Sequence, residues 1–441
     1  MAVIVGWIAE SVREILQISG LTLQSFLVFC TAFILGCFLL KPRRNLPPYP
    51  AGRVPVLGHL LALGRAPHLK LTTWRRQYGD VFTVRMGMEN VVVLNGYAAV
   101  KDALVDRSEL FASRPQITLL MRSMVGFGKD IAYARWGTEF RQRKRFATAV
   151  MKNLGMKVGT GSIEEKIREE ASFLRNRIAE YNGNPSDIAH DISVAVSNVI
   201  CSMMMGERYD YRDETFRQLS EAVVRMAAEV TAGQIINVFP FLRFVPIVNR
   251  AGINVLQEAS KIQNVIKEKM SRHRENPRDF LDFCLLEVEK QEKVEGLTEE
   301  IVVYMALDLF LAGIETTTNT LRWSLLYMTL NPDIQNKVLL NLYSLHMDPA
   351  YWPDPDRFDP GRFLDAEGNV VNKPESFMPF SGGRRVCLGE QLARMELFLF
   401  FSTLLQSFTF RTPEGAPPPT TDGVLGLTLT PHPFKLCAIP R

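Results

Sequence analysis

The segment FSGGRRVCLGEQLARMELFLFF, residues 380–401, contains the features that decide the fold of this chain. Cys387 lies among glycines, which permit a tight backbone and the close approach of a flat ligand. An amphipathic helix is expected from Glu390 to about Gln406, which places Cys387 at a helix N-terminus. The helix dipole and the free N–H groups there favour a thiolate, a strong ligand for iron. Because a lone cysteine is more often inert packing, the residues around it have to decide between the two interpretations.

Those residues follow the spacing F-x-x-G-x-R-x-C-x-G, from Phe380 to Gly389. A match by chance is expected on the order of once in ten thousand chains of this length. The segment resembles the haem-binding signature of the cytochrome P-450 monooxygenases, and its wording is similar to the microsomal family-2 branch of animals. The resemblance implies a mainly α fold with small β-sheets (α+β, the cytochrome P-450 fold), haem b (iron protoporphyrin IX) as cofactor, and Cys387 as the iron ligand.

Several side chains are expected around that cofactor. Arg385 is a fixed cation that can bind a haem carboxylate, and Phe380 can cover the ligand face. Where the family has a Trp and an Arg on a neighbouring helix, this chain has Phe140 and Lys144. Lys144 can serve as a point charge, whereas Phe140 cannot donate a hydrogen bond. The predicted cofactor contacts are Arg385, Phe380, Gly383, Gly389, Ala312, Gly313, Lys144 and Arg141.

A second motif, Ala-Gly-Ile-Glu-Thr at residues 312–316, interrupts a long helical pattern that runs from Leu297 to Leu330. Asp308, Ala312 and Thr316 are spaced by four residues and therefore share one helix face. A threonine here can bond the carbonyl four residues back and open the helix. Alone the pattern is weak, but beside the cysteine loop it is similar to the family's oxygen-activation helix. The resemblance implies that Thr316 and Glu315 are catalytic and relay protons during the activation of dioxygen.

An uncharged stretch from Ile15 to Leu40 predicts a membrane anchor near the N-terminus. Residues 21–40 are long and apolar enough to cross a bilayer as one helix. Lys-Pro-Arg-Arg follows at residues 41–44, which places the rest of the chain on the cytosolic side. A cleaved signal peptide and a buried helix are the alternatives. The predicted domains are a membrane anchor at 1–45, a proline-rich hinge at 46–58 and a haem-binding catalytic domain at 59–441.

The composition excludes several other classes of protein. Hydrophobic residues make up 47% and charged residues 22%, which excludes a disordered or collagen-like chain. The net charge is only +4 and no basic stripe is present, so no nucleic acid is expected as a partner. The cysteines are far apart and include no CxxC pair, which disfavours a disulfide scaffold or a zinc ribbon. They are Cys30, Cys37, Cys201, Cys284, Cys387 and Cys437.

The sequence also predicts the structure or role of two further segments. The alternating, valine-rich stretch from Asp80 to Gly96 predicts a β-hairpin that turns at residues 87–90. The aromatic, proline-broken stretch from Asn237 to Val248 is either core or a second membrane-contacting patch, with equal weight on each.

One departure from the family is large. Thr316 and Cys387 are only 71 residues apart, and a helix with the motif Glu-x-x-Arg, together with several strands, is expected between them. We therefore predict an internal deletion with its seam near Val338–Leu339. Arg362, whose family counterpart pairs with that Glu and Arg, would lose its partners, and an unpaired buried arginine is costly. Upstream matches to Glu-x-x-Arg at 165–168 and 214–217 are interpreted as chance surface pairs.

The resemblance implies a haem-thiolate monooxygenase that inserts one oxygen atom of dioxygen into a lipophilic small molecule. A fatty acid is weakly favoured over a steroid or a xenobiotic. Electrons would come from NADPH through a flavoprotein, NADPH-cytochrome reductase, at the endoplasmic reticulum membrane, with membrane lipid as a further partner. The alternative is a shortened, catalytically inactive chain that binds haem poorly and at most binds a partner protein. Candidate pocket residues, each equally consistent with core packing, are Ile117, Phe127 and Phe310.

Overall fold

The computed structural model of the chain describes residues 24, 27–29, 31, 45–64, 66–87, 89–114, 126–154, 162–232, 234–272, 277–330, 351–355, 357–365, 373–425 and 428–441. It consists of two compact units, Met1–Asn95 and Gly96–Arg441. The predicted class, mainly α with small β-sheets, is confirmed. The predicted anchor lies almost wholly outside the described residues, as do Ile117 and the predicted seam at 338–339, so these remain predictions.

The first unit contains the predicted β-hairpin. Its elements are α3 (Leu60–Leu63), α4 (Pro67–Tyr78), β1 (Val81–Met86) and β2 (Glu89–Leu94). The strands pair antiparallel, and Gly87 takes the positive φ of 59° that the turn requires. Phe82 packs edge-on against Trp74 of α4, with ring centroids 6.3 Å apart. The proline-rich segment lies against β1, because Pro48 accepts a hydrogen bond from the backbone N–H of Thr83. Two strands alone are marginal, and these contacts supply the missing support.

The second unit is mostly helical. Its helices are α5 (Gly96–Lys101), the π-helix η1 (Asp102–Asp106), α6 (Ser108–Phe111), α8 (Thr138–Asn153), α9 (Ile163–Ala179), α10 (Ala189–Met204), α11 (Glu214–Ala232), α12 (Gln234–Val238), η2 (Pro240–Phe244), α13 (Pro246–Met270), α14 (Phe280–Lys290), α15 (Glu299–Leu330), η4 (Pro360–Phe363), η5 (Gly383–Arg385) and α16 (Glu390–Ser407). Its strands are β3 (Phe408–Arg411), β4 (Gly423–Leu425), β5 (Leu429–Pro431) and β6 (Cys437–Pro440). Strand β3 pairs with β6 and β4 pairs with β5, both antiparallel.

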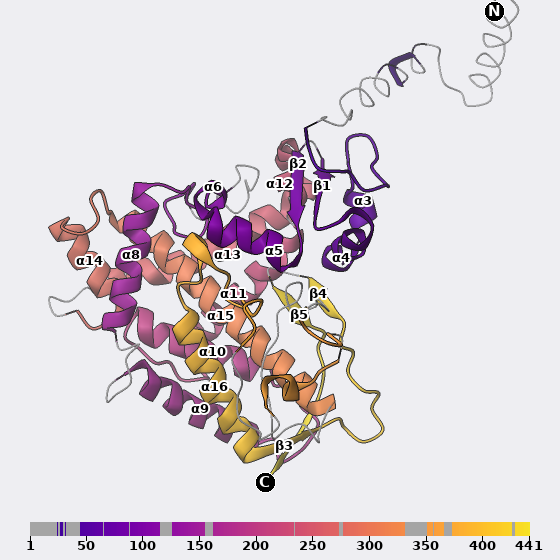
Figure 1. The fold of residues 1–441 in the computed structure, drawn as a ribbon. Coiled ribbons are helices and arrows are strands. Elements are labelled where there is room, and N and C mark those ends of the chain that lie inside the picture. Colours follow the sequence, from indigo (N-terminus) through magenta and orange to yellow (C-terminus); the bar gives the residue numbers. More distant parts are fainter. Residues whose placement is uncertain are drawn as a thin grey trace, which may run out of the picture. The chain divides into compact units, whose positions relative to one another are not determined.

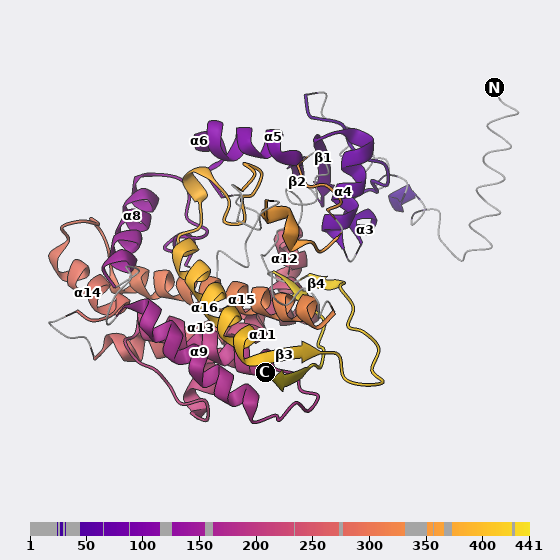
Figure 2. The same ribbon diagram turned by 60° about the horizontal axis from the view of Figure 1, so that its bottom comes forward.

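Helix α15 is the central element of this unit (Figures 1 and 2), and it contacts α10, α11, α13, α14 and α16. Its 32 residues span about 48 Å, and its start at Glu299 confirms the predicted helix within two residues. Within the described residues it is the helix long and apolar enough to cross a membrane. Because most of its side chains are buried against the neighbouring helices, α15 is a core helix.

The aromatic segment from Asn237 to Val248 divides between the two interpretations. Phe239 is buried in the core, whereas Phe241 and Phe244 are 62% and 75% exposed. Val245 is also exposed, and the guanidinium of Arg243 lies 4.7 Å from the centroid of the Phe244 ring. The exposed side chains of Phe241, Phe244 and Val245, here called the aromatic patch, therefore remain available for a partner surface.

Candidate functional site

The cysteine loop before α16 is held by backbone contacts that need its glycines. The N–H of Cys387 donates to the carbonyl of Phe380 at 3.0 Å, which closes the loop. Gly383 has a φ of 64°, and a Cβ there would lie 1.6 Å from the carbonyl oxygen of Leu104 in η1. Only glycine allows this approach, so the tight loop predicted from the sequence is present.

Cys387 presents its thiol at the surface, three residues before the start of α16 at Glu390. Its surroundings act on the thiol in opposite directions, and together they raise its pKa above the ordinary value, contrary to the thiolate expected from the helix N-terminus. Burial of part of the group raises the pKa of Cys387, and Glu390 adds to that. A hydrogen bond from the N–H of Gly389 lowers this pKa, as does the ammonium of Lys144. The sulfur is therefore accessible and already has a backbone donor directed at it.

Arg385 organises the chain around the cysteine loop. Its guanidinium donates to the carbonyls of Ala112 at 2.7 Å, Ile131 at 3.2 Å and Ala134 at 2.6 Å. It also lies 3.8 Å from the centroid of the Phe140 ring. Burial, with repulsion from Arg114, lowers the pKa of Arg385 to about 10. Two of its five N–H groups have no bond among these, so a carboxylate contact is compatible with its position.

Lys144 of α8 ties that helix to the cysteine loop. Its Nζ donates to the carbonyls of Arg384 at 3.0 Å and Val386 at 2.9 Å. Burial lowers the pKa of Lys144, repulsion from Arg385 lowers it further, and Cys387 opposes the change. One of its three protons remains for another acceptor. The neighbouring Arg141 stays exposed and lies 5.7 Å from the centroid of the Trp136 ring.

The middle of α15 has one open face. Ala312 and Thr316 are exposed, although Leu311 and Ile314 beside them are buried. The hydroxyl of Thr316 donates to the carbonyl of Ala312 at 2.6 Å, as predicted. The helix nevertheless continues unbroken through this turn, so the expected interruption of the helix is wrong. A single threonine bond to the preceding turn is compatible with regular helix geometry.

Gly313 faces α10 rather than the open face. A Cβ there would lie 2.5 Å from Cδ1 of Ile200, so close packing between α15 and α10 accounts for this glycine. Fourteen of the sixteen residues of α10 are buried, so the interface between α10 and α15 leaves no room for a side chain at position 313. Its predicted contact with the cofactor remains a prediction.

The Glu315 side chain is hydrogen-bonded beside the β4–β5 hairpin near the C-terminus. Its Oε1 accepts hydrogen bonds from Asn319 at 2.7 Å and from Thr428 at 3.1 Å. Thr428 immediately precedes β5, so the predicted catalytic carboxylate also connects α15 to the β4–β5 hairpin.

The sequence reasoning missed two buried carboxyl groups beside this site. Asp308 accepts the N–H groups of Ile131 and Ala132, at 2.8 and 2.9 Å. Burial raises the pKa of Asp308 to about 8, and repulsion from Asp130 raises it further. Asp308 was noted only for its spacing from Thr316, and a loop partner more than 170 residues away leaves no sequence signal.

The second group is Glu396 of α16, whose Oε2 accepts from Thr317 at 3.1 Å. Burial raises the pKa of Glu396 to about 8, against the hydrogen bond from Thr317. The contact joins the helix after Cys387 to the helix that carries Thr316. An acidic residue within the apolar run MELFLFF was the available signal.

The residues present fit a planar iron porphyrin. Cys387 supplies an accessible sulfur, and the small side chain of Ala312 leaves the face of α15 open. Among the described residues, no atom beyond its chain neighbours lies within 4 Å of a Cβ built at Gly389, so a flat ring can approach the backbone there. Arg385 and Lys144 retain donors for carboxylates. The accessible sulfur of Cys387, the open face of α15 and the two cations together match the donor set that haem requires, with Cys387 losing its proton on binding iron.

The candidate pocket residues differ in placement. Phe310 is fully buried in the core cluster, whereas Phe127 is exposed and has a φ of 56°. Phe310 therefore packs in the core, and Phe127 stays a candidate for contact with substrate.

Arg362 has partners, contrary to the expectation of an unpaired buried charge. Its guanidinium donates to the carbonyls of Pro353 at 2.9 Å, Asp354 at 3.3 Å, Arg357 at 2.8 Å and Asp359 at 3.0 Å. All four acceptors belong to its own loop, so the loop satisfies the charge without a helix from elsewhere in the chain.

Comparison with known proteins gives one consistent family. A family model described as "Cytochrome P450" matches residues 47–339 and 336–438. The chain is 33% identical to cytochrome P450 2U1 of Mus musculus over 509 residues, covering 95% of each chain. It is 34% identical to human cytochrome P450 2J2, covering 95% of this chain and 96% of the relative. It is also 34% identical to human cytochrome P450 2D6, covering 93% and 98%.

The lengths of these matches differ from the length of the chain. The alignment with the mouse relative has 509 positions and this chain has 441 residues, so at least 68 positions (509 less 441) lack a counterpart here. The two matched segments of the family model meet at residues 336–339.

Proposed function

The chain belongs to the cytochrome P450 family, whose members are haem-dependent monooxygenases, and we propose that it inserts one oxygen atom of dioxygen into a lipophilic small molecule. A fatty acid is the favoured substrate, ahead of a steroid or a xenobiotic. The observation that carries this proposal is the accessible thiol of Cys387 at the start of α16, with the N–H of Gly389 directed at it. The comparisons lend no support to the alternative of a catalytically inactive, partner-binding chain.

Each site residue has a defined task in this proposal. Cys387 ligates the iron of haem b through its sulfur, and Arg385 and Lys144 hold the carboxylates with their remaining N–H groups. When bound, the haem supplies the oxidation chemistry, and the protein supplies orientation and protons. Thr316 holds a proton at its Oγ1, from which it donates to the carbonyl of Ala312. The Glu315 carboxylate, one helix position away, would take up a proton from water and pass it on to replace the proton that Thr316 gives up.

Electrons require a second protein, and a basic groove offers a docking surface for it. The groove has a volume of about 520 Å³ and is lined by Trp136, Phe140, Arg141, Lys144, Arg145, Thr148, Ala149, Lys152 and Arg384. Five of these residues are cations and none is acidic. We propose NADPH-cytochrome reductase as the partner, because an acidic flavoprotein surface would complement this charge. Lys144 and Arg384 connect the groove directly to the cysteine loop.

The proposed location is the endoplasmic reticulum membrane, with the catalytic domain in the cytosol. The uncharged stretch of residues 21–40, followed by Lys-Pro-Arg-Arg, supports a single N-terminal anchor. The exposed aromatic patch of Phe241, Phe244 and Val245 supports a second contact with lipid. A membrane location suits an enzyme that takes a lipophilic substrate.

We also propose that the chain is internally shortened near Val338–Leu339. The two matched segments of the family model meet at this place, and the mouse relative has at least 68 positions (509 less 441) without a counterpart. The Glu-x-x-Arg helix that the family resemblance implies would belong to the absent segment.

The test compares two cysteine variants of the full chain, produced with haem supplied. Cys387→Ser removes the sulfur ligand, and Cys437→Ser in β6 is the control. The reduced carbon monoxide spectrum of the starting chain and of the control should show a red-shifted thiolate Soret band, and Cys387→Ser should lose it. An unchanged band in Cys387→Ser, or no thiolate band in the starting chain, would overturn the proposal.

A further inference from the structure

Asn319 of α15 is almost completely buried, with 4% of its surface exposed, and its amide joins two parts of the second unit. Its Nδ2 donates to Oε1 of Glu315 at 2.7 Å. The same nitrogen lies 2.7 Å from the hydroxyl of Thr428 and 3.0 Å from that of Thr430. Because Thr428 donates in turn to Glu315 at 3.1 Å, the three side chains form a closed set of hydrogen bonds.

We infer that Asn319 is a positioning residue: it fixes the Glu315 carboxylate to strand β5 and so holds both in one arrangement beside Thr316. The inference rests on the proposed function, in which Glu315 replaces the proton of Thr316. It adds to that function the group that determines where the carboxylate lies.

Two further bonds on the same helix face support this role. The Nη2 of Arg322 donates to the carbonyl of Pro431 at 3.3 Å, and its Nη1 donates to Oδ1 of Asn319 at 3.3 Å. The indole of Trp323 donates to the carbonyl of Leu429 at 2.8 Å. Residues four, seven and eight positions after Glu315 therefore bind the same strand, as helix geometry requires for one face.

The hairpin depends on these bonds because it is small. Strands β4 and β5 have three residues each, and a hairpin of two short strands is marginal without support. A Cβ at Gly423 of β4 would lie 2.6 Å from Leu429 and 3.1 Å from Trp323, so β4 also packs closely at this place. The hairpin is thus placed by α15, and Glu315 is placed by the hairpin and Asn319 together.

An asparagine is suited to this position because it combines two donors and an acceptor in one planar group. Leucine has the same branching but offers neither, and aspartate would place a second carboxylate 2.7 Å from Glu315. Titration of such a pair leaves a shared proton at low pH and repulsion at high pH. The charged groups hydrogen-bonded to Asn319 are Glu315 and Arg322, and Asp187 acts on Arg322 in turn.

The first experiment measures backbone hydrogen exchange in the full chain for Asn319→Leu and for Thr329→Val. Thr329 is an apt control because it is on the same helix, is also 4% exposed, and donates only to its own helix at Leu325. Asn319→Leu should raise exchange at residues 428–430 by about tenfold, the order expected when its two contacts with the hydroxyls of Thr428 and Thr430 are lost. Thr329→Val should leave it unchanged. Unchanged protection of residues 428–430 in Asn319→Leu would overturn the inference.

Asn319→Asp adds a signature that loss of packing cannot produce. Its protection factors at residues 428–430 should match the starting chain at low pH, where the pair shares a proton, and match Asn319→Leu at high pH. Because asparagine and aspartate have the same shape, full protection at both pH values would show that the site responds to shape alone, and equal loss at both would show that no proton is shared; either result contradicts the inference.

The second experiment is a double-mutant cycle of Asn319→Leu and Glu315→Gln in the holoenzyme with its reductase. The readout is the hydrogen peroxide released per NADPH oxidised, since a misplaced proton relay wastes electrons as peroxide. Asn319→Leu should raise this ratio at least threefold, on the order of a partly lost general-acid contribution. In the Glu315→Gln background it should change nothing. An equal rise in both backgrounds would overturn a role through Glu315.

The two experiments separate this inference from the proposed function. If Glu315→Gln behaves as the starting chain does, the proton relay of the proposed function is wrong, and the exchange result still decides whether Asn319 anchors β5. If residues 428–430 keep their protection, the inference fails even where Glu315→Gln is impaired.

Discussion

Arg385 in the cysteine loop and Arg362 in the loop of residues 351–363 both direct a guanidinium at backbone carbonyls, but the acceptors differ. Those of Arg385 lie 251 to 273 residues away along the chain. Those of Arg362 lie three to nine residues away. Arg385 therefore holds separate segments together, whereas Arg362 shapes a single loop. These local bonds explain how the loop of Arg362 keeps its form in a chain that we propose has lost the family partners of this arginine.

The largest expected effect is that of Arg385→Ala. Loss of the three bonds leaves the carbonyls of Ala112, Ile131 and Ala134 without their donor, and removes the cation over Phe140. We expect a loss of about 3 kcal/mol or more in the free energy of unfolding, because breaking a buried charged network is costly. Urea unfolding measures this, and haem retention should fall with it.

Arg362→Ala is the matched control for this prediction. Its acceptors lie in one partly exposed loop and can turn to water, so we expect a loss of about 1 kcal/mol or less. Equal losses for the two variants would contradict the distinction between a long-range and a local arginine.

Restoring the proposed missing segment should give Arg362 partners from outside its own loop. The corresponding residues of mouse cytochrome P450 2U1 are inserted between Val338 and Leu339. If the inserted helix supplies the Glu and Arg that the family resemblance implies, Arg362→Ala should now cost about 2–3 kcal/mol, as for a buried charge partner. Urea unfolding of the four chains, with and without the insert, measures the difference. The same cost in both backgrounds would show that Arg362 does not use the segment.

The features that were predictable from the sequence are local. The loop of Cys387 needs glycine at Gly383, and the hydroxyl of Thr316 bonds the carbonyl four residues back, so residue types within a few positions decide both. The hairpin from Val81 to Leu94 and the long helix ending at Leu330 follow from periodicity in the same way. Local rules of turn, cap and helix face carry such predictions.

The contacts that were missed join residues far apart in sequence. Asn319 meets Thr428 across 109 residues, and Asp308 meets Ile131 across 177. Neither pair has a spacing rule, since only the packing of α15 against its neighbours brings them together. The expectation that Arg362 would lack partners was also wrong. Its guanidinium donates to carbonyls of its own loop, whereas partners were expected only from a distant helix.

Glu396 of α16 is a buried carboxyl group that contacts α15, and its titration should affect the stability of the chain. Its raised pKa means that the folded chain keeps the proton between about pH 4.5 and pH 8, where the unfolded chain releases it. The contribution of Glu396 to the stability of the folded chain is therefore complete below pH 4.5, and it is lost as the pH rises towards 8. Glu396→Gln keeps the acceptor for Thr317 and does not titrate. At pH 8 it should be more stable than the starting chain by about 2 kcal/mol. The raised pKa corresponds to roughly 4 kcal/mol at this pH, at about 1.4 kcal/mol per pKa unit, and burial of the glutamine amide offsets about half of it.

Urea unfolding at about pH 5 and pH 8 checks this sign, because the advantage of the variant should shrink at the lower pH. Glu295→Gln is the control, since it makes the same replacement at an exposed carboxylate. A variant that is less stable than the starting chain at pH 8 would show that Glu396 is charged in the folded protein.

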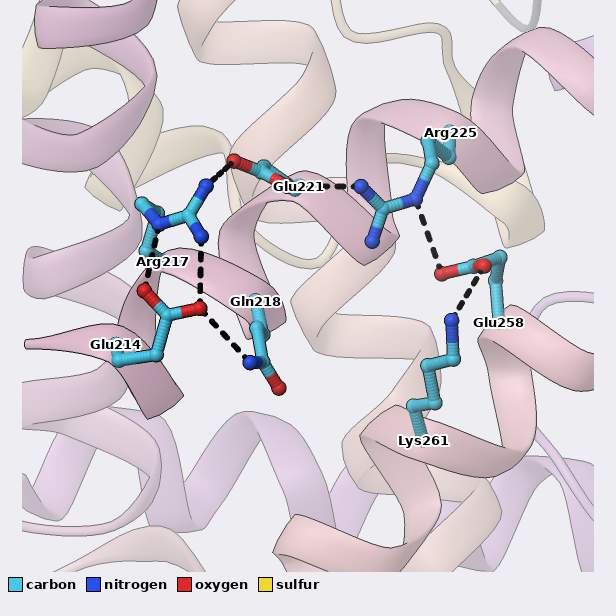
Figure 3. Close-up of polar contacts among 7 residues, drawn as sticks. All are labelled: Glu214, Arg217, Gln218, Glu221, Arg225, Glu258 and Lys261. Carbon is cyan, nitrogen blue, oxygen red and sulfur yellow. Dashed lines mark hydrogen bonds and ion pairs between the residues drawn. The ribbon is translucent and has the colours of Figure 1, made fainter.

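The smallest effect is expected at a third arginine, which pairs with two carboxylates that are 33% and 12% exposed. Figure 3 shows that Arg225 of α11 connects two groups of ion pairs. Its Nη1 lies 2.8 Å from Glu221 of the same helix, and its Nε lies 3.3 Å from Glu258 of α13. The side chains of Arg225 and Glu221 are 44% and 33% exposed, so water and salt screen their contact, and the contact with Glu258 is screened from the Arg225 side. The contacts of Arg385, by comparison, are made to carbonyls within the fold.

Arg225→Gln should therefore cost only about 0.2–1 kcal/mol, the usual range for exposed ion pairs. The cost should decrease further in about 1 M salt, where screening is nearly complete over these distances. Urea unfolding at low and high salt measures both numbers, and Arg385→Ala measured in parallel should keep most of its cost in salt. If Arg225→Gln were as costly as Arg385→Ala, or if its cost did not depend on salt, the burial of the acceptor would not be what separates the two arginines.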